Sequence, residues 1–571
     1  MPSHTRAAAF FRSGAFFSAL FIAILAFGVY ANTLRAGFVW DDASSVLLHQ
    51  HVKDPSKVFA LFAEDQHAFA GGQGNFYRPL LSVTFLIDYA IARIGQPPIP
   101  PTEIPKNLNP FVFHCSSALW HAAAAVLLLL FLQRLGTPTS VSLPAAAIFA
   151  VHPLHTEAVA YISGRADSMA AAFIFAGLYC STWRNSRAAL ATFLMLVCFA
   201  AGLLSKEAAF VFPVLLVLSR LVTQPSNNST SASRVRSWLP EFASIALLIL
   251  YFTLRATVLN FGSDTVARTA AWAARIQETF QSFAIYLRLM FVPTGLHMER
   301  TLDATPQWVA LIGAIACIAI ITAAVTAYRR GLRRAAFGLA WFLAAWLPIS
   351  GLFPLNAPMA EHWMYVPLAG FFFGLVEISC AALDRLNRPL LTRSVSVIAG
   401  VWLVLLCIFT VNRNRDWRDD ESLYIATLRE NPTSTRVHFN LAVVYQDLVD
   451  NPAGARRHFS AVTRAYEKRK EAHPEEKDNY WADELEAHVS LGDLYAADYR
   501  FAEAFAHYRV ALGVEPTGPN AVLVAQAAYG AGRCFLATGD LNQARAYLQQ
   551  AANLAPALSA EIERLLPPAA P

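Results

Sequence analysis

Two adjacent aspartates, Asp41 and Asp42, follow an apolar run in a chain that is otherwise poor in charge. The run, residues 14–31, is long enough to cross a bilayer, so both carboxylates are expected at the membrane surface on its far side. Desolvating a carboxylate there costs free energy that a partner or a substrate must offset. Such a group could act as a general base on an attacking hydroxyl. The alternative is a solvated loop start, where Asp-Asp is common.

Further polar side chains gather in short motifs between the apolar segments, on the same predicted side of the membrane as the two aspartates. Any one motif could be a helix cap or a buried ion pair, such as Arg165 with Asp167 or with Glu157, or Lys206 with Glu207. All of them together are better explained by a shared polar cavity. The candidate residues are His152, His155, Glu157, Arg165, Asp167, Lys206, Glu207, Glu361 and His362.

The residue types in this predicted cavity suit the transfer of a group from a phosphate carrier to an alcohol. Arg165, Lys206 and the histidines could hold a phosphate, the arginine through two parallel hydrogen bonds. A carboxylate could take the proton of the attacking hydroxyl. A metal site at His152, His155 and Glu157 is an alternative, because this spacing could share one helical face. Pro153 and the lack of a fourth ligand argue against it.

Composition predicts a polytopic membrane protein. The hydrophobic share is 56%, the mean hydropathy is +0.39 and the charged share is only 15%, well away from the averages of soluble domains. The net charge of +5 says little about nucleic acid, because the basic residues lie in short clusters between apolar segments, and no nucleic-acid partner is expected. The seven cysteines show no zinc or disulfide spacing.

The basic clusters set the predicted orientation, with Arg6 and Arg12 in the cytoplasm and the first segment kept as an anchor rather than cleaved as a signal peptide. Segments 77–94 and 275–292 carry charge among apolar residues and are predicted to lie along the membrane surface. About eleven spans and an outer C-terminus follow. After the first segment, the apolar segments are 111–132, 141–157, 167–183, 188–204, 208–222, 240–258, 306–328, 335–352, 365–383 and 395–411.

Beyond a membrane domain of residues 1–412 and a linker of 413–430, residues 431–571 contain internal repeats. Small and large residues recur at the offsets of a tetratricopeptide repeat, where small side chains let two antiparallel helices approach. Such a solenoid offers a concave surface for a protein partner, or it only stabilises the protein. The copies comprise Leu491, Gly492, Tyr495, Ala504, Tyr508, Ala511 and Pro516; then Gly532, Phe535, Ala544, Leu548, Ala551 and Pro556; and, more weakly, Leu441, Ala442 and Tyr445, with a slip near Ala455.

Six motifs in order resemble those of the transmembrane and tetratricopeptide-repeat-containing O-mannosyltransferases. This resemblance implies an all-α membrane domain of the glycosyltransferase C type, a polyprenyl-phosphate sugar donor and a Ser or Thr acceptor. It also implies that an acidic residue in the first outer loop, about residues 35–110, is the base, and it adds Arg78 to the predicted pocket. The motifs are Phe38-Val-Trp-Asp-Asp42, Tyr77-Arg-Pro-Leu80, His152-Pro-Leu-His-Thr-Glu-Ala-Val159, Gly164-Arg-Ala-Asp167, Ser205-Lys-Glu207 and Ala360-Glu-His-Trp-Met-Tyr-Val-Pro367.

The chain departs from the eukaryotic pattern in two places. His362 stands where those members tend to carry Arg, and the repeats number about three. With its alanine-rich composition the chain looks bacterial, which implies an inner-membrane enzyme with a periplasmic active site, an undecaprenyl-phosphate donor and mannose as the default sugar. A eukaryotic source would place the site in the endoplasmic reticulum lumen. A divalent metal lacks support, and a sequon at Asn227–Thr230 falls in a predicted cytoplasmic linker.

Two further functions compete with transfer. One is a membrane-anchored repeat scaffold for envelope assembly without catalytic activity, which would not need Asp41, Arg165 or Glu361. The other is a transporter or flippase, which should show duplicated spans with broken helices at matching positions. The sequence shows no such duplication.

Overall fold

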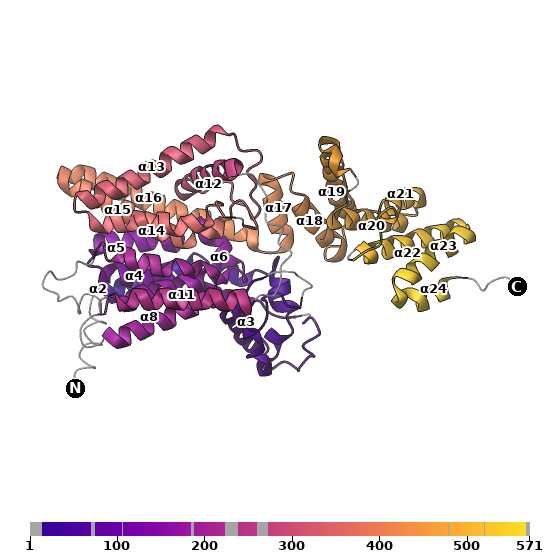
Figure 1. The fold of residues 1–571 in the computed structure, drawn as a ribbon, viewed down its shortest axis with the longest axis horizontal. Coiled ribbons are helices and arrows are strands. Elements are labelled where there is room, and N and C mark those ends of the chain that lie inside the picture. The colour runs from indigo at the N-terminus through magenta and orange to yellow at the C-terminus, as the bar shows by residue number, and fades with distance from the viewer. Residues whose placement is uncertain are drawn as a thin grey trace. The chain divides into compact units, whose positions relative to one another are not determined.

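The computed structural model describes residues 14–69, 75–105, 107–183, 188–222, 238–259, 272–353, 355–477, 479–518 and 520–566. This part of the chain is all-helical apart from turns, loops and one isolated antiparallel bridge between Arg300 and Met359 (Figure 1). The chain divides into two compact units, Met1–Leu423 and Tyr424–Pro571. The predicted sequon and the basic residues Arg6 and Arg12 lie outside the described residues.

The first unit consists of apolar helices that follow the predicted apolar segments. Five stretches of the described chain are long and apolar enough to cross a membrane: Phe111–Arg134, Leu239–Thr257, Trp308–Arg329, Glu361–Leu386 and Pro389–Trp417. The protein is therefore an integral membrane protein, while the count of eleven spans stays a prediction. The helices are α2 (Gly14–Gly28), α4 (Phe111–Arg134), α5 (Thr139–Val151), α7 (Arg165–Ser181), α8 (Ala188–Leu203), α9 (Phe212–Ser219), α11 (Leu239–Thr257), α13 (Trp308–Arg329), α14 (Arg333–Trp346), α15 (Tyr365–Leu386) and α16 (Pro389–Arg413).

Two predicted apolar segments are broken where the polar motifs begin. The segment 141–157 ends as a helix at Val151, because His152 precedes a proline and takes an extended conformation (ψ 129°). A 3-10 turn (Pro153–His155) and the short helix α6 (Thr156–Ala160) follow it. The segment 208–222 starts as a 3-10 turn, Glu207–Val211, before α9. These breaks place polar motifs at helix ends.

The two segments predicted to lie along the membrane surface are helices as well. They are α3 (Pro79–Ala92) and α12 (Trp272–Phe291), and α12 is not among the described helices that are apolar enough to span. Within the bundle, α14 packs backbone to backbone on α15. A Cβ at Gly370 would lie 2.8 Å from the carbonyl oxygen of Gly338, so glycine permits this approach. Close packing there anchors α15, which begins directly after Glu361 and His362.

The second unit is built from successive helix pairs. Gly492 faces the ring of Tyr508, and a Cβ at Gly532 would lie 2.6 Å from Leu548, so these small residues do allow neighbouring helices to approach. The assignment to tetratricopeptide repeats remains a prediction. The pairs are α18 (Thr435–Asp447) with α19 (Pro452–Ala472), α20 (Ala482–Ala497) with α21 (Phe501–Leu512), and α22 (Asn520–Thr538) with α23 (Leu541–Leu554), followed by α24 (Ser559–Leu565). The predicted linker 413–430 is helical, with a 3-10 turn (Asn414–Trp417) and α17 (Asp420–Glu430).

Candidate active site

The two adjacent aspartates differ in their surroundings. Asp42 is fully buried: its Oδ1 accepts hydrogen bonds from the backbone N–H (2.8 Å) and hydroxyl (2.7 Å) of Ser163, and its Oδ2 accepts from the N–H of Val39 (3.1 Å). Burial raises the pKa of Asp42 to about 7 in spite of these bonds. Asp41 is exposed and is a hydrogen-bond partner of the Tyr161 side chain. Asp42 therefore holds the loop to Ser163, while Asp41 faces solvent.

Trp40 holds the backbone that presents Asp41 in a strained conformation. Its φ is +52°, which is unusual for a bulky residue without glycine's freedom. The Trp40 N–H donates to Oδ1 of Asp420 at 2.8 Å, and the N–H of Gly37 donates to the carbonyl of Arg418 at 2.7 Å. Strain of this kind persists only where surrounding contacts over-determine it, and it concentrates at functional sites.

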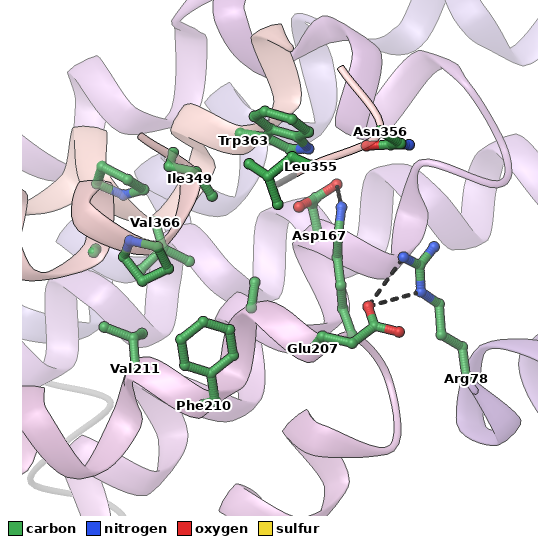
Figure 2. A pocket seen from close by; sticks show the side chains of 15 residues that line it. Arg78, Asp167, Glu207, Phe210, Val211, Ile349, Leu355, Asn356, Trp363 and Val366 are labelled. Carbon is green, nitrogen blue, oxygen red and sulfur yellow. Dashed lines mark hydrogen bonds and ion pairs between the residues drawn. The ribbon is translucent and has the colours of Figure 1, made fainter. Parts of the chain in front are cut away.

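A cavity of about 220 Å³ lies beside the 3-10 turn Glu207–Val211 and the start of α15 (Figure 2). One end is charged: Arg78 pairs with Glu207 (Nη2 to Oε2, 3.0 Å), and Lys206 pairs with Asp167 (2.6 Å). The rest of the wall is mostly apolar. Its remaining lining residues are Ala208, Phe210, Val211, Ala345, Pro348, Ile349, Leu355, Asn356, Trp363, Val366 and Pro367. Four of the predicted pocket residues thus meet in a cavity with a polar end and an apolar body.

Arg165 lies apart from this lining. Its guanidinium is fully buried and pairs with Asp88 (2.5 Å), not with Asp167 or Glu157. It also donates to the Thr84 hydroxyl (3.0 Å), the Ser117 hydroxyl (3.0 Å) and the Phe113 carbonyl (2.7 Å). These contacts join α7 to α3 and α4. The predicted contact of Arg165 with a donor phosphate therefore stays a prediction, and its observed contacts are structural.

Glu157, Glu361 and His362 form a second polar cluster at the start of α15. His362 contacts Glu157 through both its backbone N–H (3.2 Å) and its Nδ1 (2.8 Å). Glu361 accepts from the backbone N–H of His297 at 2.7 Å. Its carboxylate also lies 3.3 Å from Arg300 Nη2 and 3.5 Å from Arg413 Nη2. This cluster joins α6, the loop after α12 and the end of α16 to the turn before α15, and the neighbouring Trp363 extends from it into the cavity lining.

The remaining predicted residues, His152 and His155, are buried and bonded to the backbone. His152 Nε2 lies 2.9 Å from the Met290 carbonyl, and its Nδ1 accepts from the N–H of Leu154 at 3.2 Å. His155 Nδ1 lies 2.8 Å from the Phe149 carbonyl. No group of three or more metal-ligating side chains occurs among the described residues. The side chains of the two histidines and Glu157 therefore have separate partners in this structure.

Sequence reasoning missed the residues that link Asp41 to the cavity. Tyr161 bonds to Asp41 and interacts electrostatically with Arg78, and its ring stacks on Trp417 at 5.4 Å. Gln66 accepts from Arg78 Nη1 (3.3 Å) and donates to the Ser45 hydroxyl (3.0 Å). Neither Tyr161 nor Gln66 lies in one of the six motifs, although Gln66 directly follows Glu64 and Asp65, so neither was a candidate. They connect the aspartate loop to the cationic end of the cavity.

These features define a helical membrane protein with an exposed loop carboxylate and a cavity in which paired cations lie beside an apolar wall. Comparison with known proteins agrees. The family model described as dolichyl-phosphate-mannose-protein mannosyltransferase matches residues 96–262, a stretch that includes the cavity residues Asp167, Lys206 and Glu207.

Named relatives extend the similarity beyond that stretch. The chain is 31% identical to Protein O-mannosyl-transferase Tmtc2 of Drosophila melanogaster, over 51% of this chain and 31% of that protein. It is 23% identical to TMTC3 of Mus musculus over 85% of this chain and 54% of that protein, and 25% identical to TMTC4 of Homo sapiens over 77% and 65%. The chain thus spans about a third to two thirds of these relatives. No solved structure matches.

The resemblance that the motifs predicted is therefore confirmed: the chain is similar to protein O-mannosyl-transferases.

Proposed function

We propose that this protein is an inverting glycosyltransferase that moves a sugar, mannose by default, from a polyprenyl-phosphate donor to a Ser or Thr hydroxyl of a protein on the outer face of the membrane. The cavity carries the proposal, because it combines a charged end with an apolar body. A lipid-linked sugar phosphate has the same two-part chemistry. The matched family model and the relatives' names support this donor and acceptor class.

In the proposed reaction, Arg78 and Lys206 hold the donor's phosphate while apolar residues such as Phe210 and Val211 contact the lipid chain. The acceptor oxygen attacks the anomeric carbon, and the bond from that carbon to the phosphate oxygen breaks on the opposite side. The phosphate leaves with the bonding electron pair, and the two cations stabilise its charge. Configuration at the anomeric carbon is inverted in this single displacement.

Asp41 is the base in this proposal, and it takes the acceptor's hydroxyl proton as the new bond forms. Its exposure leaves the carboxylate accessible to an acceptor, whereas both oxygens of Asp42 already accept hydrogen bonds. Asp42 and Trp40 position the loop. Glu361 and Glu157 act at a distance from the reacting atoms, by fixing the segment that carries Trp363.

In this proposal, the helix pairs of residues 431–571 bind the protein that accepts the sugar. A repeat solenoid tethered to the membrane domain would bind a protein substrate and raise its effective concentration at the active site, to the millimolar range for a short flexible tether. The proposed setting is the bacterial inner membrane with the site facing the periplasm. No step requires a metal ion.

The test is transfer from polyprenyl-phosphate [³H]mannose to Ser/Thr peptides by protein reconstituted in nanodiscs. We expect incorporation that is sensitive to mild base, as for a sugar O-linked to Ser or Thr. The double variant Arg78→Gln/Lys206→Gln should lose donor use, while Asp303→Asn, a change at an exposed loop carboxylate, should match the wild type. Failure of the wild type with every polyprenyl-phosphate sugar, on peptides and whole envelope proteins alike, would overturn the proposal.

A further inference from the structure

The charged end of the cavity is already balanced before any ligand enters. Its two cations, Arg78 and Lys206, each pair with a carboxylate, Glu207 and Asp167, at 3.0 and 2.6 Å. An anionic phosphate that binds Arg78 must therefore displace Glu207. The Glu207 side chain is 35% exposed, and a carboxylate displaced from its partner in this partly buried place loses stabilisation unless it finds another hydrogen-bond donor. The structure should then hold a spare donor near Glu207.

Tyr251 has such a spare donor. It is only 7% exposed, whereas its neighbours Leu250 and Phe252 on α11 are more than half exposed. Its buried hydroxyl has no hydrogen-bond partner among the described residues. Most buried hydroxyl groups are hydrogen-bonded, so an unpaired one calls for an explanation.

Neighbouring contacts of α11 place this hydroxyl toward the Arg78–Glu207 pair. The ring of Phe252 lies 6.4 Å from that of Phe210, a cavity-lining residue. Arg255, one turn after Tyr251, donates to the Asn75 carbonyl at 2.7 Å and lies 5.7 Å from the centre of the Tyr77 ring. Residues four apart share a helix face, so Tyr251 lies on the face that meets the segment before Arg78.

Electrostatics agree with this placement. The Tyr251 hydroxyl interacts with both Glu207 and Arg78. α11 also packs on α9, the helix that follows Glu207. We therefore treat the three groups as one cluster: the Arg78 cation, the Glu207 carboxylate that pairs with it, and the unpaired Tyr251 hydroxyl nearby.

We propose that Tyr251 is a positioning residue for a phosphate monoester or diester in this cavity: its hydroxyl donates a hydrogen bond to the Glu207 carboxylate when the phosphate displaces that carboxylate from Arg78. The exchange keeps both Arg78 and Glu207 paired with and without the phosphate, and no bond other than hydrogen bonds changes. That the phosphate belongs to a lipid-linked sugar rests on the proposed function. The exchange itself requires only a phosphate group.

The test measures binding of undecaprenyl monophosphate to full-length protein in nanodiscs, which needs no turnover. Tyr251→Phe removes one oxygen, and we expect the Kd to rise about tenfold, the loss of a hydrogen bond to a charged group. Tyr328→Phe, at an exposed tyrosine of α13, is the control and should bind like the wild type. In turnover, Tyr251→Phe should raise the KM for the donor and leave kcat nearly unchanged.

A double-mutant cycle tests whether Tyr251 affects phosphate binding through Glu207. Glu207→Gln removes the charge that must move, so it should tighten phosphate binding, and adding Tyr251→Phe should then change the Kd less than twofold. An unchanged Kd in Tyr251→Phe, or an equal loss in both backgrounds, would overturn the proposal. If Tyr251→Phe does not fold, weaker binding by Glu207→Gln alone would overturn it.

Excess inorganic phosphate separates the two phosphate sources. Displacement of the lipid assigns the site to a free phosphate ion, and its retention assigns the site to the lipid head group; either result is compatible with the exchange. A wild type that binds the lipid but transfers no sugar would overturn the proposed function and leave this inference standing.

Discussion

Replacing the two aspartates one at a time separates catalysis from loop structure. Asp41→Asn removes the proposed base from an exposed position and leaves the hydrogen bonds of Asp42 to Ser163 and Val39 in place. Transfer should fall by at least about 10²-fold, which corresponds to about 2.7 kcal/mol in the barrier. Its melting temperature should stay at the wild-type value.

Asp42→Asn should instead lower the stability of the protein and largely preserve the transfer rate. The carboxylate accepts three hydrogen bonds, from Ser163 twice and from Val39. An asparagine keeps one accepting oxygen but turns an NH₂ toward a donor on the other side. Losing that bond costs about 1–3 kcal/mol, so we expect a lower melting temperature and a rate per folded molecule within about tenfold of the wild type.

The pH dependence supplies an independent check on Asp42. Its pKa in the folded protein is about 7, above the ordinary value of 3.8, because it is buried. The folded state therefore binds the proton more tightly than the unfolded state does. The stability that this group contributes should decline as pH rises from about 4 to about 7 and then level off, and the Asn variant should lack this decline.

The assays are initial rates of mannose transfer in nanodiscs and thermal unfolding of the same preparations. A folded Asp42→Asn protein without activity, next to a fully active Asp41→Asn protein, would refute the assignment of the two roles. Full activity in the double Asn variant would refute base catalysis by this pair altogether.

Three further outcomes are expected. Arg165→Lys should lower the melting temperature by several degrees and leave the donor KM unchanged, because lysine cannot reproduce the planar guanidinium contacts with Asp88 and its neighbours; a raised KM at wild-type stability would return Arg165 to the donor site. In the second unit, Nδ1 of His488 lies 3.0 Å from Nδ1 of His507, and burial lowers the pKa of His488 to about 4. The folded state therefore binds this proton less tightly than the unfolded state does. Hydrogen exchange in the full-length protein should show this region losing stability, on the order of 3 kcal/mol, as pH falls from about 6.5 to about 4. The double Gln variant of this pair should lose that slope, and a slope that persists would contradict the prediction. Truncation after Asn431 should reduce transfer to protein acceptors and spare transfer to a short peptide; equal loss on both would mean that the repeats support the fold.

Much of the helical framework was predictable from the sequence. Apolar segments such as 111–132 and 240–258 match α4 and α11 closely, because hydrocarbon-length apolar runs leave helix as the simplest way to satisfy the backbone. The motifs also predicted the family resemblance and four residues that meet in the cavity. The pairing of those four residues was not predictable, since Lys206 bonds to Asp167 on another helix rather than to its neighbour Glu207.

What the sequence by itself determined were the local properties: the apolar length of the segments and the presence of paired aspartates after the first of them. Only the tertiary structure decided which aspartate is buried. Asp42 is buried against Ser163, a residue far along the chain that donates two hydrogen bonds to its carboxylate. It likewise turned Arg165 toward Asp88 and buried Tyr251 between more exposed neighbours on α11. Ion-pair partners and burial are set by contacts between distant segments, and one-dimensional spacing carries no information about which partner lies nearest.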